Sequence, residues 1–228
     1  MIIPAVSIYM TSYNEERHIQ ECIISILGQS FENFELIIVD DGSTDRTINK
    51  IESFKDKRIK LYANSHNYIE SLNLATSLSK GKYLAKMDAD DIMMPDRLLI
   101  QYNYLEFNNT IDILAGGMQF FGTINTEYIP IVKEKDITKN NFSQDNIIAH
   151  PTVMIRKSSV QNLIPNLYDE EFKYAEDYKL WLELLDIGLK FDIIPDILIK
   201  YRTSNKQTSF VKKEEQVKVT AKIKTLFF

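Results

Sequence analysis

Three carboxylates fall within four positions at the end of one apolar-leaning run of the sequence, at Asp88, Asp90 and Asp91. Two carboxylates held about 5 Å apart at an effective dielectric constant of about 20 repel by roughly 3 kcal/mol, and a third adds to that cost. A divalent cation with oxygen ligands offsets the repulsion, and Mg²⁺ or Mn²⁺ sites typically combine one or two carboxylates with substrate phosphates. These residues therefore indicate either a metal and diphosphate site or a solvated acidic turn.

Two motif types can be tested against this spacing. An EF-hand loop starting at Asp88 needs an acid or Asn, then Gly, and later Glu at positions where the chain has Ile92, Met93 and Leu99. The same run resembles the Asp-x-Asp-x-Thr/Val motif of haloacid-dehalogenase phosphotransferases apart from Ile92, so an Asp88 nucleophile is an alternative. Neither G-x-G-x-x-G nor a Walker A motif occurs, which disfavours a nicotinamide dehydrogenase or a P-loop ATPase.

The elements that must position these acids alternate between strands and helices. Apolar runs predict buried strands, and apolar stripes at helical spacing lie between them. The predicted strands cover 6–10, 34–39, 59–62, 111–115 and the run that begins at Tyr83, and the stripes fall within 19–27, 48–54, 68–78 and 98–105. Asn14 is expected to cap the first helix, and Gly28 lies just beyond its end. The alternation predicts an α/β fold with a doubly wound, largely parallel sheet.

Polar residues follow four of these strands. They are Thr11 to Asn14, Asp40-Asp41, His66-Asn67 and Asp88 to Asp91. In open α/β sheets, ligands bind outside the carboxyl ends of the strands. The four strand ends therefore predict one binding site along a single rim.

The second half of the chain has a looser pattern. Residues 118–146 are expected to be irregular and to contribute substrate contacts, and strands are predicted over 152–155, 191–194 and 198–201. Glu176 and Asp177 are expected in the first turn of a helix, where the helix dipole favours negative charge. From Lys212 onward, Val219, Ile223, Leu226 and Phe227 share one helix face among lysines. This pattern predicts a packed terminal helix or, alternatively, one that contacts a membrane surface or a partner.

Composition excludes several classes of protein. The 228 residues are 44% apolar and carry a net charge of −5, which disfavours a nucleic-acid partner. Cys22 is the single cysteine and is expected in the core, so the sequence gives no sign of an oxidising compartment. Pro4 and the lack of a basic segment argue against a signal peptide, and no apolar run reaches the roughly 20 residues of a spanning helix. We expect a cytoplasmic protein, either soluble or peripheral at the inner face of the cell membrane.

Three ordered motifs carry a resemblance to a known family. They are the segments 6–16, 34–45 and 81–91, the last followed by Pro95 and Arg97. Together they resemble family 2 glycosyltransferases of the GT-A fold, strongly over residues 5–115 and more patchily to about 205. The resemblance implies a Rossmann-like, mostly parallel sheet, with residues 1–117 as the nucleotide-sugar half, 118–210 as the acceptor and catalytic-base half, and 211–228 as a C-terminal helix.

The resemblance assigns roles to residues of the donor half. Thr11, Tyr13 and Asp41 match positions that hold the nucleotide base, Tyr13 by stacking and Asp41 by accepting a hydrogen bond from uracil. Asp88 matches a position near ribose or metal, and Asp90 matches the metal ligand on the diphosphate. The implied cofactor is Mn²⁺ or Mg²⁺.

The resemblance also assigns roles to Asn67, which follows the third predicted strand, and to residues in the second half of the chain. Asp177 matches the general base, and Glu176 and Asn67 match substrate-binding positions, although Ile69 stands where the family often has glycine. His150 is expected either to touch donor or acceptor or to be a hydrogen-bonded structural histidine. Arg202 is expected either to reach the phosphates or to pair with a surface acid.

The resemblance implies an inverting, metal-dependent hexosyl- or N-acetylhexosaminyl-transferase. The expected donor is a UDP-sugar, and the expected acceptor is a hydroxyl of a glycan or lipid-linked molecule in bacterial surface polysaccharide synthesis. The absence of a Gln-x-x-Arg-Trp motif and of membrane helices favours one sugar per encounter. A phosphotransferase and a catalytically silent sugar-nucleotide-binding subunit are the alternatives.

Overall fold

A computed structural model describes residues 3–129, 137–204 and 207–228. These residues form a nine-stranded sheet in the order β3-β2-β1-β4-β8-β6-β9-β5, with β7 paired to β6. The strands are β1 (Val6–Ser12), β2 (Phe34–Asp40), β3 (Ile59–Ala63), β4 (Tyr83–Lys86), β5 (Ile92–Met93), β6 (Ile113–Gly122), β7 (Thr126–Tyr128), β8 (Met154–Arg156) and β9 (Phe191–Thr203).

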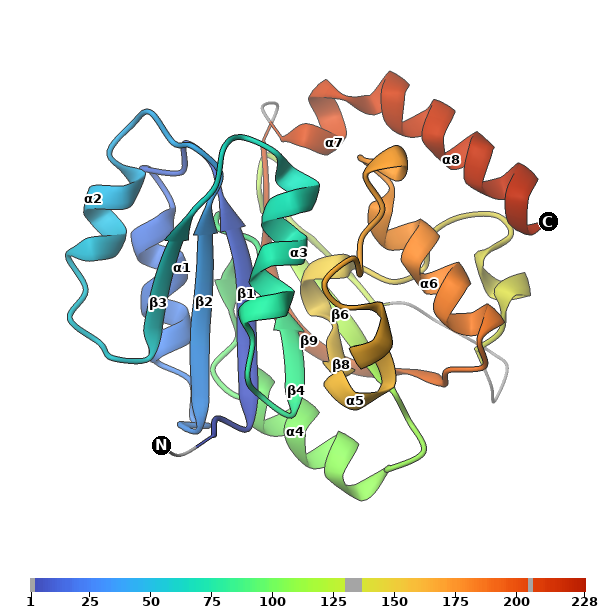
Figure 1. Ribbon diagram of the computed structural model, residues 1–228, viewed down its shortest axis with the longest axis horizontal. Helices are drawn as coiled ribbons and strands as arrows, with labels where there is room; N and C mark the ends of the chain where they lie inside the picture. The colour runs from blue at the N-terminus through green and yellow to red at the C-terminus, as the bar shows by residue number, and fades with distance from the viewer. Residues whose placement is uncertain (1–2, 130–136, 205–206) are drawn as a thin grey trace.

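Helices cover both faces of this sheet (Figure 1). They are α1 (Ile19–Leu27), α2 (Thr47–Glu52), α3 (Tyr68–Leu78), α4 (Arg97–Phe107), α5 (Lys157–Val160), α6 (Glu176–Asp186), α7 (Thr208–Val211) and α8 (Lys213–Phe227). One core cluster joins the sheet to α1, α2 and α4, and the other joins it to α3, α6 and α8. The predicted doubly wound α/β architecture is confirmed.

The sheet is parallel on one side and mixed on the other. Strand β1 pairs in parallel with β2 and with β4, and β2 pairs in parallel with β3, as predicted. Strand β8 is antiparallel to both β4 and β6, and β9 runs parallel to β6. The mixed part joins the 118–210 segment to the first half in one continuous sheet. Within that segment, residues 130–136 and 205–206 lie outside the described part.

Several strand predictions need correction. The strand expected over 111–115 begins at Ile113 and continues to Gly122, into the region expected to be irregular, which also contains β7. The strands expected over 191–194 and 198–201 form one long strand, β9. The register between β6 and β9 shifts at Gly116 and Gly117, so Pro195 and Asp196 are accommodated as a bulge and the pairing continues beyond them. The strand expected over 152–155 begins later, at Met154, because residues 150–152 form a 3₁₀ turn.

The predicted cap of α1 is wrong. The helix begins at Ile19 after His18, which makes no capping hydrogen bond. Asn14 instead has a φ of 54°, a conformation that asparagine tolerates better than most residues. Its Oδ1 accepts hydrogen bonds from the backbone amides of Thr44 at 2.8 Å and Asp45 at 3.3 Å. Asn14 therefore ties the loop after β1 to the loop after β2.

Arg97 connects the end of β4 to the residue that precedes β8. Its side chain is fully buried, and Nη2 donates to the carbonyl oxygens of Lys86 at 2.9 Å and Val153 at 3.2 Å. Its Nε donates to Oε1 of Gln101 at 3.0 Å. Because Lys86 ends β4 and Val153 precedes β8, one guanidinium fixes the spacing of two strand ends.

We expect Arg97→Met to lower the free energy of unfolding by about 3 kcal/mol or more, because buried acceptors lose their donor. For a chain of this size the melting temperature should fall by about 6–12 °C. Thermal denaturation followed by circular dichroism measures this. Arg46→Met is the control, since Arg46 is highly exposed and its pair with Glu16 contributes at most about 1 kcal/mol. Similar melting temperatures for the two variants would contradict the assignment.

Candidate active site at the carboxyl ends of the strands

The predicted rim is present at the carboxyl ends of β1, β2, β3 and β4. The parallel register sets Ser12 beside Asp40 and Asp40 beside Ala63, so the turns that follow these strands lie together. The loop after β4 joins them, because β4 pairs with β1 along its length. Four loops that are far apart in sequence therefore border one site.

An aromatic corner lies after β1 and β3. Tyr13 is 42% exposed, and its ring centroid is 4.2 Å from that of His66. Beside them, the buried Asp41 accepts a hydrogen bond from Ser71 Oγ at 2.6 Å, and its Oδ2 lies 3.7 Å from Nδ1 of His66. Thr11 is half-buried on β1. This corner presents an open ring beside a carboxylate, which suits a planar base with a hydrogen-bond donor.

Asn67 caps helix α3 at this rim. Its Oδ1 accepts from the backbone amide of Glu70 at 3.3 Å, and its Nδ2 donates to Glu170 Oε1 at 2.9 Å. Both ends of the amide therefore have protein partners.

The three acids after β4 have different surroundings. The fully buried Lys86 forms an ion pair with Asp88 and also donates to the carbonyl oxygen of Met87 at 2.9 Å. Burial alone would raise the pKa of Asp88, but the Lys86 ammonium outweighs burial and holds that pKa below its usual value. For Asp90, burial and the Asp88 charge raise the pKa to about 6. Lys86 thus neutralises Asp88, whereas Asp90 forms no ion pair with any residue that the structure describes.

Asp91 is fully buried beneath the rim. Its Oδ1 accepts from the backbone amide of Arg202 at 2.8 Å, and its Oδ2 has no partner among the described residues. Burial and the charges of Asp90 and Asp88 raise its pKa well above the usual value. Asp91 therefore anchors the end of β9 to the acidic loop.

Arg202 contacts the acidic loop and a surface acid. Its Nε donates to the carbonyl oxygen of Asp90 at 2.8 Å, and its Nη2 donates to Glu21 Oε2 at 2.6 Å. The guanidinium also lies 4.4 Å from the centroid of the Phe121 ring. These contacts match the expected pairing with a surface acid, and they fix the backbone of the loop that presents Asp90.

Two acids occupy the first turn of α6, as predicted. Asp177 accepts hydrogen bonds from the Tyr178 amide at 2.8 Å and from Asn146 Nδ2 at 2.9 Å, yet burial raises its pKa to about 6. Glu176 is 7% exposed, and its Oε2 has no partner among the described residues. Burial and the charge of Asp177 raise the pKa of Glu176 to about 7.

His150 lies within the core beside Tyr168 and Trp181. Its Nε2 is 2.8 Å from the Tyr168 hydroxyl, which in turn is 2.7 Å from the Tyr9 hydroxyl. The His150 ring packs edge-on against Trp181. Burial and the Lys86 charge lower its pKa to about 3, so the ring is neutral. This position agrees with the expectation that His150 is a hydrogen-bonded structural histidine.

Among the described residues, no group of three or more His, Cys, Asp or Glu side chains is arranged to hold a metal ion. A cation bound to a nucleotide diphosphate needs only one or two protein carboxylates, because the phosphates supply further oxygens. Asp90 fits that requirement, since its carboxylate is ionisable and has no cationic partner like the one on Asp88.

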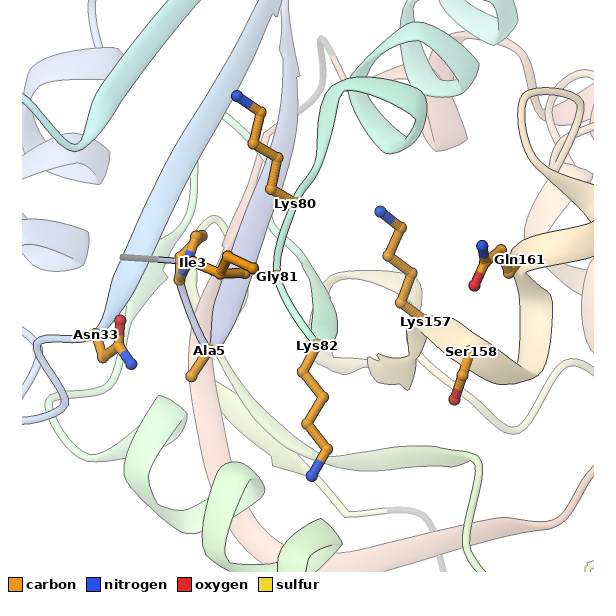
Figure 2. Close-up of a pocket in the computed structure, with 10 residues that line it drawn as sticks. Ile3, Ala5, Asn33, Lys80, Gly81, Lys82, Lys157, Ser158 and Gln161 are labelled. Carbon is orange, nitrogen blue, oxygen red and sulfur yellow. The ribbon is translucent and has the colours of Figure 1, made fainter. Parts of the chain in front are cut away.

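A cavity of about 430 Å³ lies elsewhere, at the amino ends of the strands (Figure 2). Lys80, Lys82 and Lys157 line it. Lys82 pairs with Glu106, and Lys157 donates to the carbonyl oxygen of Ser79 at 2.6 Å. It contains none of the predicted site residues.

A family model described as glycosyl transferase family 2 matches residues 7–164. The chain belongs to this family. It is 36% identical over 238 residues to an uncharacterized glycosyltransferase of Haemophilus influenzae, covering 97% of this chain and 72% of that one. It is 32% identical to WfgD of Escherichia coli, named as a UDP-Glc:alpha-D-GlcNAc-diphosphoundecaprenol beta-1,3-glucosyltransferase, covering 92% of this chain and 81% of that one.

Solved structures confirm the GT-A fold. TarS of S. aureus in complex with UDP-GlcNAc superimposes with a TM-score of 0.79 at 21% identity, covering 96% of this chain and 65% of that one. A mannosyltransferase of Pyrobaculum calidifontis, in complex with GDP-Man and Mn²⁺, gives a TM-score of 0.69 at 17% identity, covering 94% of this chain and 61% of that one. The chain thus spans less than two thirds of the length of these structures.

Family membership makes this chain a glycosyltransferase and removes the haloacid-dehalogenase alternative, because the matched segment contains the whole acidic loop. No described helix is both long enough and apolar enough to cross a membrane.

The raised carboxyl pKa values predict an unusual pH dependence of stability. Three acids bind protons more tightly in the folded than in the unfolded chain: Asp90, Asp177 and Glu176. Their protonation therefore stabilises the folded state fully below about pH 4, and this stabilisation is lost as the pH rises to about 7. We expect the melting temperature of the metal-free protein, measured in EDTA, to fall between pH 5 and pH 8. Asp90→Asn should reduce the slope. A flat profile, or an unchanged slope in the variant, would contradict these pKa directions.

Proposed function

We propose that this glycosyltransferase is an inverting, divalent-metal-dependent enzyme that transfers a sugar from a UDP-sugar to a hydroxyl of a lipid-linked or glycan acceptor. The observation that carries the proposal is the arrangement of the rim. An exposed aromatic ring with a neighbouring carboxylate lies at one end of the rim. After β4 lies Asp90, which forms no ion pair with any described residue, and a hydrogen-bonded aspartate lies on α6.

The donor base is proposed to occupy the Tyr13 and Asp41 corner. Uracil offers an N–H donor at N3 that the Asp41 carboxylate can accept, and its ring can stack on the exposed face of Tyr13. Cytosine has an unprotonated, accepting nitrogen at the same position, which a carboxylate repels. The names of WfgD and of the TarS complex, which mention UDP-Glc and UDP-GlcNAc, support a UDP-sugar.

The diphosphate is proposed to lie over the acidic loop, with Mn²⁺ or Mg²⁺ held by Asp90. When bound, the cation would offset the charge that develops on the departing diphosphate. Lys86 keeps Asp88 ionised and fixed in orientation, so Asp88 can accept a hydrogen bond from a ribose hydroxyl or add one oxygen to the metal. The Mn²⁺ in the mannosyltransferase structure supports this cofactor.

Asp177 is proposed as the general base. Its carboxylate takes the proton of the acceptor hydroxyl, the oxygen attacks the anomeric carbon from the side opposite the diphosphate, and the bond to the diphosphate breaks with inversion. A pKa of about 6 leaves Asp177 mostly ionised at neutral pH and closer to the working pH than an exposed aspartate would be. Glu176 is buried beside it, and its Oε2 has no hydrogen-bond partner among the described residues, so Glu176 is proposed to hydrogen-bond a substrate hydroxyl.

The acceptor is proposed to be lipid-linked, as the name of WfgD states for that enzyme, within bacterial surface polysaccharide synthesis. Such an acceptor would bring a cytoplasmic enzyme to the inner face of the membrane. Helix α8 is the proposed contact, because it packs on the core through Val219, Ile223 and Phe227 while Lys218 and Lys222 are exposed. Leu226, expected on the packed face, is also 61% exposed.

We expect UDP with Mn²⁺ to raise the melting temperature of the protein, CDP to raise it less, and EDTA to remove most of the UDP effect. Asp90→Ala should abolish the Mn²⁺-dependent part of UDP binding, measured by isothermal titration calorimetry. Asp91→Ala should instead destabilise the fold, because the Arg202 amide loses its buried acceptor, while retaining much of the Mn²⁺-dependent binding. Equal loss of binding in both variants, or no stabilisation by any nucleotide, would overturn the proposed site.

A further inference from the structure

We infer that Asn146 is a positioning residue for Asp177, holding the carboxylate of the catalytic base in its ionised, correctly oriented form. The inference rests on the proposed role of Asp177 as the general base. It concerns the segment between Phe142 and Ile148, from which the sequence predicted only unspecified substrate contacts.

Hydrogen bonds on both ends of the Asn146 amide fix its orientation. Oδ1 accepts from the backbone amide of Ile148 at 3.2 Å, and Nδ2 donates to Asp177 Oδ2 at 2.9 Å. The Asn146 backbone amide donates to Asp145 Oδ1 at 2.8 Å. Since the backbone donor of Ile148 requires an oxygen opposite it, the nitrogen of the amide must face the carboxylate.

The segment that carries Asn146 is fastened to the elements around the base. The hydroxyl of Tyr178, the residue after Asp177, donates to the carbonyl oxygen of Phe142 at 2.6 Å. On the other side, Lys224 of α8 donates to the carbonyl oxygen of Gln144 at 2.5 Å. The segment that carries Asn146 is thus hydrogen-bonded to α6, the helix that carries Asp177. Such a fixed segment suits a residue that orients another side chain.

The charges around Asp177 explain why a neutral donor is needed. Glu176 lies beside it on α6, Asp88 faces it from the end of β4, and the hydroxyls of Tyr9 on β1 and Tyr68 on α3 also lie within its electrostatic surroundings. Burial and the neighbouring acids disfavour its ionised form. Among the described residues, Asn146 is the one side chain recorded as donating to this carboxylate. A hydrogen bond to the charged form favours that form.

A neutral amide also leaves Asp177 able to act. A lysine or arginine in the same place would form an ion pair and make the carboxylate a poorer base. Asn146 occupies one oxygen, Oδ2, and the Tyr178 amide occupies the other, Oδ1. Each carboxylate oxygen has two acceptor sites, so one remains on each oxygen for the acceptor hydroxyl. The pair of donors sets the direction in which those sites point.

The test is the pH dependence of turnover in Asn146→Asp, which keeps the shape of the side chain but replaces the donor with a second carboxylate. UDP release from UDP-Glc and UDP-GlcNAc is measured with a synthetic GlcNAc-diphosphoryl-lipid acceptor. We expect the acidic limb of kcat to move upward by about one pH unit, so that kcat falls about twofold at pH 7 and nearly tenfold at pH 5. Asn146→Ala, which removes the donor without adding charge, should show a smaller shift in the same direction.

Asn140→Asp is the matched control, because it adds the same charge to an exposed position nearby. Its pH profile should superimpose on that of the wild type, and all variants should retain the Kd for UDP. Profiles for both Asn146 variants that superimpose on the wild type would overturn the inference. The variant Asp177→Asn tests the proposed base separately from the positioning residue. If this variant retains turnover, Asp177 is not the base. If it loses turnover while the Asn146 variants have wild-type pH profiles, only the role of Asn146 is rejected.

Discussion

Repulsion among the carboxylates at the end of β4 is the constraint that the surrounding structure has to meet. The buried ammonium of Lys86 neutralises Asp88, and Asp91 is held beneath the loop by the backbone amide of Arg202. Asp90 is left at the rim with a raised pKa and forms no ion pair within the described part of the chain. In the proposed complex, a nucleotide diphosphate with its divalent cation would offset that charge, and donor binding would then stabilise the loop.

The second half of the chain contributes to the same rim because the sheet is continuous. Strand β8 pairs with β4, and Arg97 joins the end of β4 to the residue that precedes β8. Helix α6 packs on the sheet through Trp181 and Leu182, which places its first turn near the acidic loop. The distance between the acidic loop after β4 and Asp177 is therefore set by buried contacts, which suits the proposed role of Asp177 as the base.

Much of this arrangement could be predicted from the sequence. Parallel strands end at one edge, so the positions of Tyr13, Asp41 and Asp88 followed from the apolar runs before them. The motifs also predicted the GT-A fold. The role of Asn14 could not be predicted, because local spacing favoured a helix cap while the structure uses its amide to join two loops.

Residues whose partners are distant in sequence gave a weaker signal. His66 was placed on the rim by its position after β3, but its contact with Tyr13 depends on loop conformation. Asn146 lies in a segment without a regular pattern, and its partner is 31 residues away. Lys86 is the last residue of β4, and no local pattern indicated that its ammonium would form an ion pair with Asp88. Such contacts arise from tertiary packing, which neither periodicity nor propensity encodes.

A crystal structure of the protein with UDP and Mn²⁺ tests the central claim most directly, namely that the rim at the carboxyl ends of the strands binds the nucleotide diphosphate. We expect uracil to stack on Tyr13 with N3 donating to Asp41, and Mn²⁺ to lie between Asp90 and the phosphates. Nucleotide bound away from this rim, for example in the cavity beside Lys80 at the opposite edge of the sheet, would contradict it. Mn²⁺ bound without Asp90 would contradict it as well.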